Sequence, residues 1–180
     1  ACWLAYGFFK PSYPEILVLE LAADRPGDIG YLVDVVRPSV GVVTAVGETS
    51  VHVEFYSSTL EVAKEKGRQI ESLPSDGLAT LNYDDQTVLG MKEMSKAKVM
   101  TFGFSKDSHI RISDISYFLT ANCQLPTSNS SIGGLSFKIN HGGTFIPARV
   151  NNMIGIHQLY GVMAAVAVGT HFGMNLIEIA

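Results

Sequence analysis

The chain has 180 residues, which suits one domain, and 47% of them are hydrophobic, which is enough for a sizeable core. Its 13 basic and 17 acidic residues give a net charge of -4 without a basic cluster, which argues against a nucleic-acid-binding surface. No apolar run reaches the roughly 18 residues that a membrane span needs. Cys2 and Cys123 have no Cys or His companions at metal-ligand spacing, which is typical of reduced thiols in a cytoplasmic protein.

The first half of the sequence alternates between predicted strands and predicted helices. Apolar runs predict buried strands at residues 16–21, 40–46, 78–81 and 98–104. Capping residues and helical spacing predict helices at about 24–36, 58–73 and 84–96. This alternating order predicts an α/β fold, a mostly parallel sheet with helices on both faces.

The pattern changes after residue 105. Three predicted strands, at 110–120, 135–140 and 144–150, are separated by Gly-rich turns, and residues 139–143 carry a hairpin signal. They predict a small antiparallel sheet attached to the parallel one. Residues 154–172 predict a long buried helix, and Asn175 starts a further helix of which only one turn is present. Because one turn is not stable alone, we expect the natural protein to continue.

Polar residues occur near the carboxyl ends of the predicted strands, where open α/β sheets bind ligands. Glu20 ends the first strand, His52 follows the second, and residues 82–85 follow the third. Each has an ordinary structural interpretation as well. A carboxylate at a strand end can be exposed or hydrogen-bonded, a lone loop histidine is more often structural, and Asp84 or Asp85 can cap a helix.

Lys66 lies inside the apolar stripe of its predicted helix. The stripe consists of Leu60, Val62, Ala63, Ile70 and Leu73. The residues outside it are Lys64, Glu65, Arg68 and Glu71. A lysine in such a place either extends its amine to water or serves chemistry, because burial disfavours the charged form and frees the amine for a reaction such as carbamylation.

His157 and Gln158 open the last long helix, whose free N–H groups could face a ligand or could simply be capped. The sequence contains neither a G-x-x-x-x-G-K-[ST] phosphate loop nor a G-x-G-x-x-G fingerprint. Motifs of this kind therefore do not identify a nucleotide-binding protein.

Six short segments, in this order, resemble the Mur ligase family, the ATP-dependent amide-forming enzymes of peptidoglycan synthesis. The likeness is greatest to the branch that adds D-alanyl-D-alanine to a UDP-N-acetylmuramoyl tripeptide. The segments are VLELAADRPGDI at 18–29, VVTAVG at 42–47, VHVEF at 51–55, VAKEKG at 62–67, LNYDD at 81–85 and IGIHQ at 154–158.

The resemblance implies a P-loop-NTPase-like central domain and a carbon–nitrogen ligase that uses ATP and Mg²⁺. In this reaction the peptide carboxylate becomes an acyl phosphate, which the amine of D-alanyl-D-alanine then attacks. Carried over by position, Glu20 and His52 would bind Mg²⁺ and Lys66 would be a carbamylated lysine. His157, Gln158 and Asn82 would contact the nucleotide. The resemblance also implies a cytoplasmic monomer.

On this reading residues 1–180 are a central ATP-binding domain cut at both ends, with the phosphate loop upstream of Ala1 and a further ligase domain after Ala180. We therefore expect the 180 residues alone not to ligate. The chain departs from the family pattern at Ala45, Gln158 and Gly161, and in the longer loop before His52. The alternatives are a folylpolyglutamate synthase-like or other Mur-type ligase, a non-catalytic α/β domain that kept the fold, and a chance match to a doubly wound domain.

Overall fold

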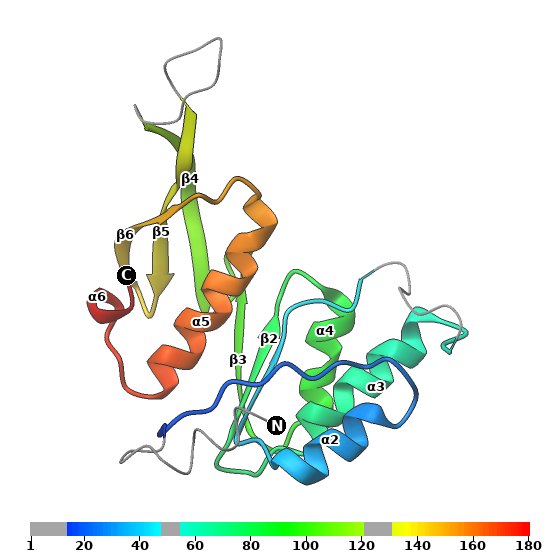
Figure 1. The fold of residues 1–180 in the computed structure, drawn as a ribbon. Helices are drawn as coiled ribbons and strands as arrows, with labels where there is room; N and C mark the ends of the chain where they lie inside the picture. The colour runs from blue at the N-terminus through cyan, green and yellow to red at the C-terminus, as the bar shows by residue number, and fades with distance from the viewer. Residues whose placement is uncertain (1–13, 48–54, 121–130) are drawn as a thin grey trace.

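Within residues 14–47, 55–120 and 131–180, which the computed structural model describes, six strands form one sheet (Figure 1). The strands are β1 (Val40–Val43), β2 (Leu78–Asn82), β3 (Lys98–Gly103), β4 (Ile110–Thr120), β5 (Ser131–His141) and β6 (Thr144–Asn151). They lie side by side in chain order. β1 to β4 pair in parallel, whereas β4, β5 and β6 pair antiparallel, so the predicted antiparallel strands continue the parallel sheet.

Helices cover both faces of the sheet, which confirms the predicted α/β architecture (Figure 1). On one face α3 (Thr59–Glu71) packs on β1, α4 (Gln86–Gly90) packs on β2, and α2 (Asp28–Val36) packs on α3. The short 3-10 helix η1 (Met91–Met94) follows α4. On the other face α5 (Leu159–His171) crosses β2, β3 and β4. It is preceded by the 3-10 turn η2 (Ile156–Gln158) and followed by α6 (Leu176–Ile179).

Apolar side chains fill the space on each side of the sheet. Leu78 and Phe102 are fully buried in the cluster beneath α5, whereas Ala79 and Leu81 are fully buried in the cluster beneath α3 and α4. Consecutive residues of β2 thus serve opposite faces, as the pleat of a strand requires. Among the described residues, no helix has the length and apolarity that crossing a membrane would need.

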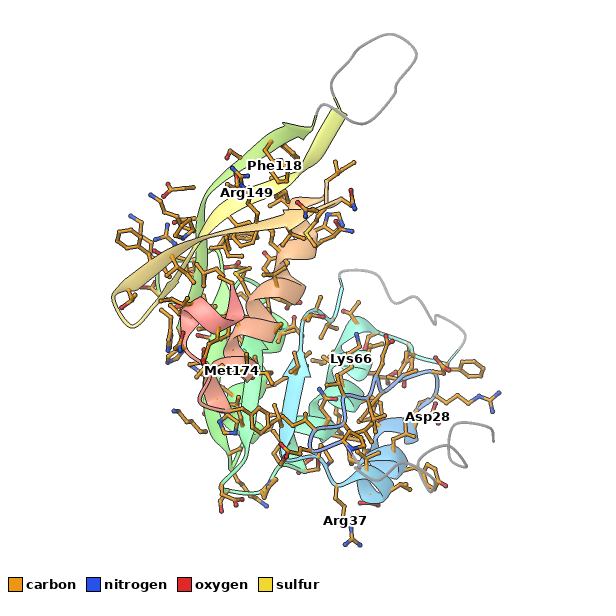
Figure 2. The ribbon with its side chains drawn as sticks, turned by 60° about the vertical axis from the view of Figure 1, so that its left-hand side comes forward. Asp28, Arg37, Lys66, Phe118, Arg149 and Met174 are labelled. Carbon is orange, nitrogen blue, oxygen red and sulfur yellow. The ribbon has the colours of Figure 1, made fainter. Side chains whose placement is uncertain are left out.

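The antiparallel strands include the predicted hairpin. Gly142 and Gly143 join β5 to β6 with φ values of 56° and 80°. Two consecutive left-handed residues form the two-residue turn that glycine favours, which explains the signal in the sequence. Further along these strands the guanidinium of Arg149 lies 5.1 Å from the centroid of the Phe118 ring, so β4 and β6 also meet through side chains (Figure 2).

The predicted strand at residues 16–21 is not formed. The segment has no strand pairing, and Val18 is 88% exposed and Leu17 61% exposed. It lines an open groove of about 690 Å³ that residues 38–45 of the β1 region also line. An apolar run becomes a strand only when hydrogen-bonding neighbours satisfy its backbone, and the groove separates this run from β1, which is the edge of the described sheet.

A turn at residues 25–28 shifts the start of the first described helix. It was expected from about residue 24, yet α2 begins at Asp28, because the Asp28 carboxylate accepts a 2.7 Å hydrogen bond from the N–H of Arg25 and Gly27 takes a left-handed φ of 98°. The helix ends at Val36 as expected, since Pro38 disfavours helical backbone in the residue before it.

The apolar stripe of α3 is only partly buried. Ser58 caps the helix as predicted, with its hydroxyl accepting from the N–H of Glu61 at 3.3 Å. Ile70 is fully buried, but Leu60 is 73% exposed, so its predicted burial is wrong. Leu60 lies in the first turn of the helix, beyond the reach of the buried cluster on this face of the sheet.

This difference can be tested by stability measurements. We expect Ile70→Ala to lower the free energy of unfolding by about 2–5 kcal/mol, because it leaves a cavity beside the sheet. Leu60→Ala on the same helix should change it by less than about 0.5 kcal/mol. Urea unfolding followed by circular dichroism measures both. Equal losses for the two variants would contradict the burial described for α3.

Candidate functional site

Polar groups gather where β1, β2 and β3 end. Because these strands are parallel neighbours, their carboxyl ends lie together along one side of the sheet, which we call the carboxyl edge. This is where open α/β sheets bind ligands. Side-chain hydrogen bonds join the segments that follow the strands, at residues 44–46, 82–85 and 104–105, to α3 and α5. This edge is the candidate site.

The end of β1 is held from two sides. The amide nitrogen of Asn82, on β2, donates to the carbonyl oxygen of Thr44 at 2.8 Å. The amine of Lys66, on α3, donates to the carbonyl oxygen of Ala45 at 3.0 Å. Figure 2 shows Lys66 pointing from α3 toward the upper end of β1. Side chains of two other elements therefore fix the path of the backbone as it leaves the sheet.

Asp85 adds a third support to the same stretch. One carboxylate oxygen accepts from the N–H of Val46 at 3.1 Å. The other accepts from the N–H groups of Thr87 and Val88, so Asp85 is the N-cap of α4. The prediction that an aspartate of this motif caps a helix is confirmed, and the second bond ties the capped helix to the end of β1.

Asn82 is 3% exposed, and both ends of its amide are engaged. While the nitrogen bonds to Thr44, the oxygen accepts from the N–H of Asp84 at 3.0 Å. The residue therefore joins the ends of β1 and β2. Its expected contact with a nucleotide stays a prediction, and the amide keeps one N–H and one oxygen lone pair beyond these two bonds.

Asp84 connects three elements that are far apart in the sequence. Its carboxylate accepts from the N–H groups of Phe104 at 2.6 Å and Ser105 at 3.1 Å, and from the hydroxyl of Tyr160 at 3.1 Å. A Cβ atom on Gly103 would lie 2.8 Å from this carboxylate, so the close approach requires glycine there. No spacing in the sequence indicates this contact, because Tyr160 lies 76 residues from Asp84.

Lys66 and Glu20 line the same groove, together with Ala45 and Gln69. Lys66 is half-buried and Glu20 is exposed. Two of the residues that the sequence singles out therefore line one groove. His52 lies outside the described residues. Within the described ranges, His, Cys, Asp and Glu side chains form no group of three or more that could hold a metal ion.

The burial of Glu65 differs from the prediction that helical spacing gives for α3. It was expected outside the buried stripe, yet it is 4% exposed. Its carboxylate accepts from the N–H of Ile29 at 2.9 Å and from the guanidinium of Arg68 at 2.9 Å. The cause is α2, which packs on this side of α3 and brings the N–H groups of its first turn to the carboxylate.

His157 and Gln158 lie in η2, at the start of α5, and both are exposed. They lie on the α5 face of the sheet, whereas Lys66 lies on the α3 face. The hydrogen bond between Tyr160 and Asp84 connects this helix start to the carboxyl edge. Burial, and after it the Asp84 carboxylate, raise the pKa of Tyr160 to about 12.

The parallel sheet, its polar carboxyl edge and the helices on both faces define an α/β domain of the kind that binds nucleotides. The Mur ligase middle domain matches residues 7–169, and the chain therefore belongs to the Mur ligase family. This finding confirms the resemblance inferred from the six segments.

Three known proteins show how far the likeness extends. UDP-N-acetylmuramoyl-tripeptide--D-alanyl-D-alanine ligase of Mycobacterium leprae is 28% identical over 171 residues, which cover 92% of this chain and 31% of that protein. UDP-N-acetylmuramoyl-L-alanyl-D-glutamate--2,6-diaminopimelate ligase of Chlamydia caviae is 28% identical over 152 residues, which cover 84% of this chain and 26% of that protein. MurF ligase from Thermotoga maritima, solved in complex with ADP, matches with a TM-score of 0.76 at 23% identity, covering 94% of this chain and 36% of that one. This chain thus spans about a third of the length of such relatives.

The engagement of Asn82 leads to a stability prediction. We expect Asn82→Ala to lower the free energy of unfolding by about 1–3 kcal/mol, because it leaves the Thr44 carbonyl and the Asp84 N–H without their partner. Urea unfolding measures the loss, and Gln86→Ala, at an exposed position in the first turn of α4, is the control. An Asn82→Ala chain as stable as the unaltered one would contradict the bridging role.

The raised pKa of Tyr160 leads to a pH prediction. A phenol in an unfolded chain ionises near a pKa of about 10, so between about pH 10 and 12 the folded chain retains a proton that the unfolded chain loses. This contribution to stability is complete below about pH 10 and is lost as the pH rises to about 12. We expect the stability difference between the unaltered chain and Tyr160→Phe to shrink across this range.

Absorbance titration of the phenolates in the same two proteins checks the assignment. One ionisation near pH 12 should be missing from Tyr160→Phe. The same ionisation should remain in Tyr31→Phe, which alters an exposed tyrosine of α2. Identical titration curves for Tyr160→Phe and the unaltered chain would show that another group carries the shift.

Proposed function

We propose that this chain is the ATP-binding central domain of a ligase that adds D-alanyl-D-alanine to a UDP-N-acetylmuramoyl tripeptide through an acyl phosphate. The observation that carries the proposal is the groove along β1 that Lys66 and Glu20 both line, in a chain that belongs to the Mur ligase family. The likeness to a D-alanyl-D-alanine ligase over 92% of the chain supports the choice of substrate branch.

Lys66 is suited to carbamylation by its position. The uncharged amine would attack carbon dioxide, form a nitrogen–carbon bond and release one proton, which leaves an anionic carbamate. The carbamate nitrogen keeps one N–H, and this can retain the hydrogen bond to the Ala45 carbonyl that the amine makes at 3.0 Å. The two carbamate oxygens would then face the groove that Glu20 also lines.

These groups suit a magnesium ion as far as the described residues extend. Mg²⁺ prefers oxygen ligands and retains several waters, so one carboxylate from Glu20 and a nearby carbamate are a reasonable partial set. His52 is proposed as a further ligand, carried over by position from the family. When bound, the ion would neutralise charge on the transferred phosphate. In this proposal, residues of this chain hold oxygen ligands for the ion beside the groove.

The nucleotide would reach the same edge from the α5 face. His157 and Gln158 are exposed at a helix start, where free N–H groups favour anionic or polar ligands. Asn82 would support the site mainly by holding the ends of β1 and β2 together. ADP in the complex of the Thermotoga maritima protein supports a nucleotide as the ligand of this fold.

The rest of the ligase would be supplied by other parts of the polypeptide. Since this chain spans about a third of the length of its relatives, we propose that residues 1–180 need neighbouring domains for the phosphate loop and for the amine substrate. The partners would be the UDP-N-acetylmuramoyl peptide and D-alanyl-D-alanine, handled by a cytoplasmic monomer that binds no nucleic acid. The 180 residues alone should not ligate.

A second substrate branch is favoured by one observation. The Chlamydia caviae relative, whose name gives 2,6-diaminopimelate as its substrate, has the same 28% identity as the Mycobacterium leprae relative. Offering the complete ligase each amine in turn separates the two. Ligation of diaminopimelate without ligation of D-alanyl-D-alanine would assign the complete ligase to the branch that adds diaminopimelate.

The role of Lys66 leads to a prediction for the complete ligase. We expect Lys66→Ala to reduce kcat by about 100-fold or more, because charge stabilisation at the site of phosphoryl transfer is lost. Phosphate release during ligation measures the rate. Lys64→Ala is the matched control, since it removes an exposed lysine two residues earlier on α3.

Two further results refine this test. A small carboxylic acid in the buffer should restore part of the activity of Lys66→Ala by placing an anion where the carbamate was. Arginine cannot be carbamylated in this way, so Lys66→Arg should stay inactive although it keeps the positive charge. Unchanged ligation by Lys66→Ala and His52→Ala would refute the catalytic assignment.

A further inference from the structure

The turn before α5 is tied to the sheet on both of its flanks. Just before it, the hydroxyl of Tyr117, on β4, donates to the carbonyl oxygen of Ile154 at 3.1 Å. Just after it, the hydroxyl of Tyr160 donates to the Asp84 carboxylate, also at 3.1 Å. One bond comes from β4 and the other reaches the turn after β2, so together they constrain both the position and the direction of the segment between them.

The second of these attachments is supported by two further contacts. The Tyr160 ring packs edge-on against Phe104, with ring centroids 5.0 Å apart. The Asp84 oxygen that accepts its hydroxyl also accepts from the N–H of Phe104 at 2.6 Å. The acceptor is therefore bonded to the residue that follows β3, and the tyrosine contacts that residue through its ring and Asp84 through its hydroxyl.

Inside the turn, the absence of a side chain on Gly155 leaves room for the His157 ring. A Cβ atom on Gly155 would lie 2.5 Å from Cε1 of that ring. The backbone of Gly155 has φ −81° and ψ 119°, values that any residue adopts, so backbone conformation does not require glycine here. The N–H of Gln158 closes the turn by donating to the Gly155 carbonyl at 3.0 Å. The ring thus lies against the glycine that begins the turn.

We propose that Tyr117 and Tyr160 are positioning residues that clamp the turn at residues 155–158 and hold His157 and Gln158 in place for an adenine nucleotide. The inference rests on the proposed function. Its physical basis is preorganisation: side chains that are already ordered lose less freedom when a ligand binds. Neither tyrosine needs to touch the nucleotide for this effect.

Single hydroxyl deletions in the complete ligase test the clamp. We expect Tyr117→Phe and Tyr160→Phe each to raise the KM for ATP by about three- to ten-fold, which corresponds to the loss of one hydrogen bond. The values of kcat and of the KM for the amine substrate should stay within about two-fold, because a misplaced turn weakens nucleotide binding and leaves the other subsites intact. Tyr31→Phe on α2, 70% exposed, is the matched control.

A further variant leaves both tyrosines in place. Gly155→Ala forces the His157 ring to move while the backbone and both hydroxyl bonds can remain. It should also raise the KM for ATP, with an unchanged melting temperature. Agreement between the glycine and tyrosine variants would place the effect on the turn and not on general stability.

Each other outcome has a distinct meaning. An unaltered ligase that binds no ATP would contradict the proposed function and the clamp together. Normal ATP binding by the unaltered ligase, by both tyrosine variants and by their combination would refute the clamp alone. A fall in kcat and a rise in every KM, together with a lowered melting temperature, would also refute it, because the tyrosines would then serve only the stability of the fold.

Discussion

The three hydrogen bonds at the end of β1 are the constraint on which the candidate site depends. Asn82, Lys66 and Asp85 come from β2, α3 and the start of α4, and each bonds to a different backbone group of residues 44–46. Among the described residues, β1 is a short strand with a sheet neighbour on one side only. Without these side chains, residues 44–46 would lose the hydrogen bonds that set their path after β1. The same side chains therefore stabilise the fold and set the direction in which the backbone leaves β1.

The site is divided between the two faces of the sheet. Lys66 belongs to the α3 face, and the turn with His157 and Gln158 belongs to the α5 face. They can cooperate only at the carboxyl edge, where the bonds from Thr44 to Asn82, from Asn82 to Asp84 and from Asp84 to Tyr160 run across the strand ends. This series of hydrogen bonds joins the end of β1 to α5, which lie far apart in the sequence.

Much of the fold can be predicted because its signals are local. The Ser58 and Asp85 caps, the two glycines of the hairpin and the apolar strands each follow from a few neighbouring residues. What could not be predicted depends on partners far along the chain. Glu65 is buried because α2 lies over it, and residues 16–21 remain unpaired because a groove separates them from β1. Within the site, spacing singled out Lys66, but the bond between Asp84 and Tyr160 has no local signature.

The open side of β1 has a practical consequence for handling the chain. Within the described residues the outer side of β1 has no strand partner, and an unpaired strand edge beside exposed apolar side chains, here those of residues 16–19, is a surface through which separate molecules can associate. Gln69 partly shields it, because its amide nitrogen donates to the Val42 carbonyl at 2.7 Å and occupies one acceptor. Replacing Gln69 by an apolar residue would release that acceptor. Gln69 therefore protects part of the described sheet edge, although it has no part in the proposed chemistry.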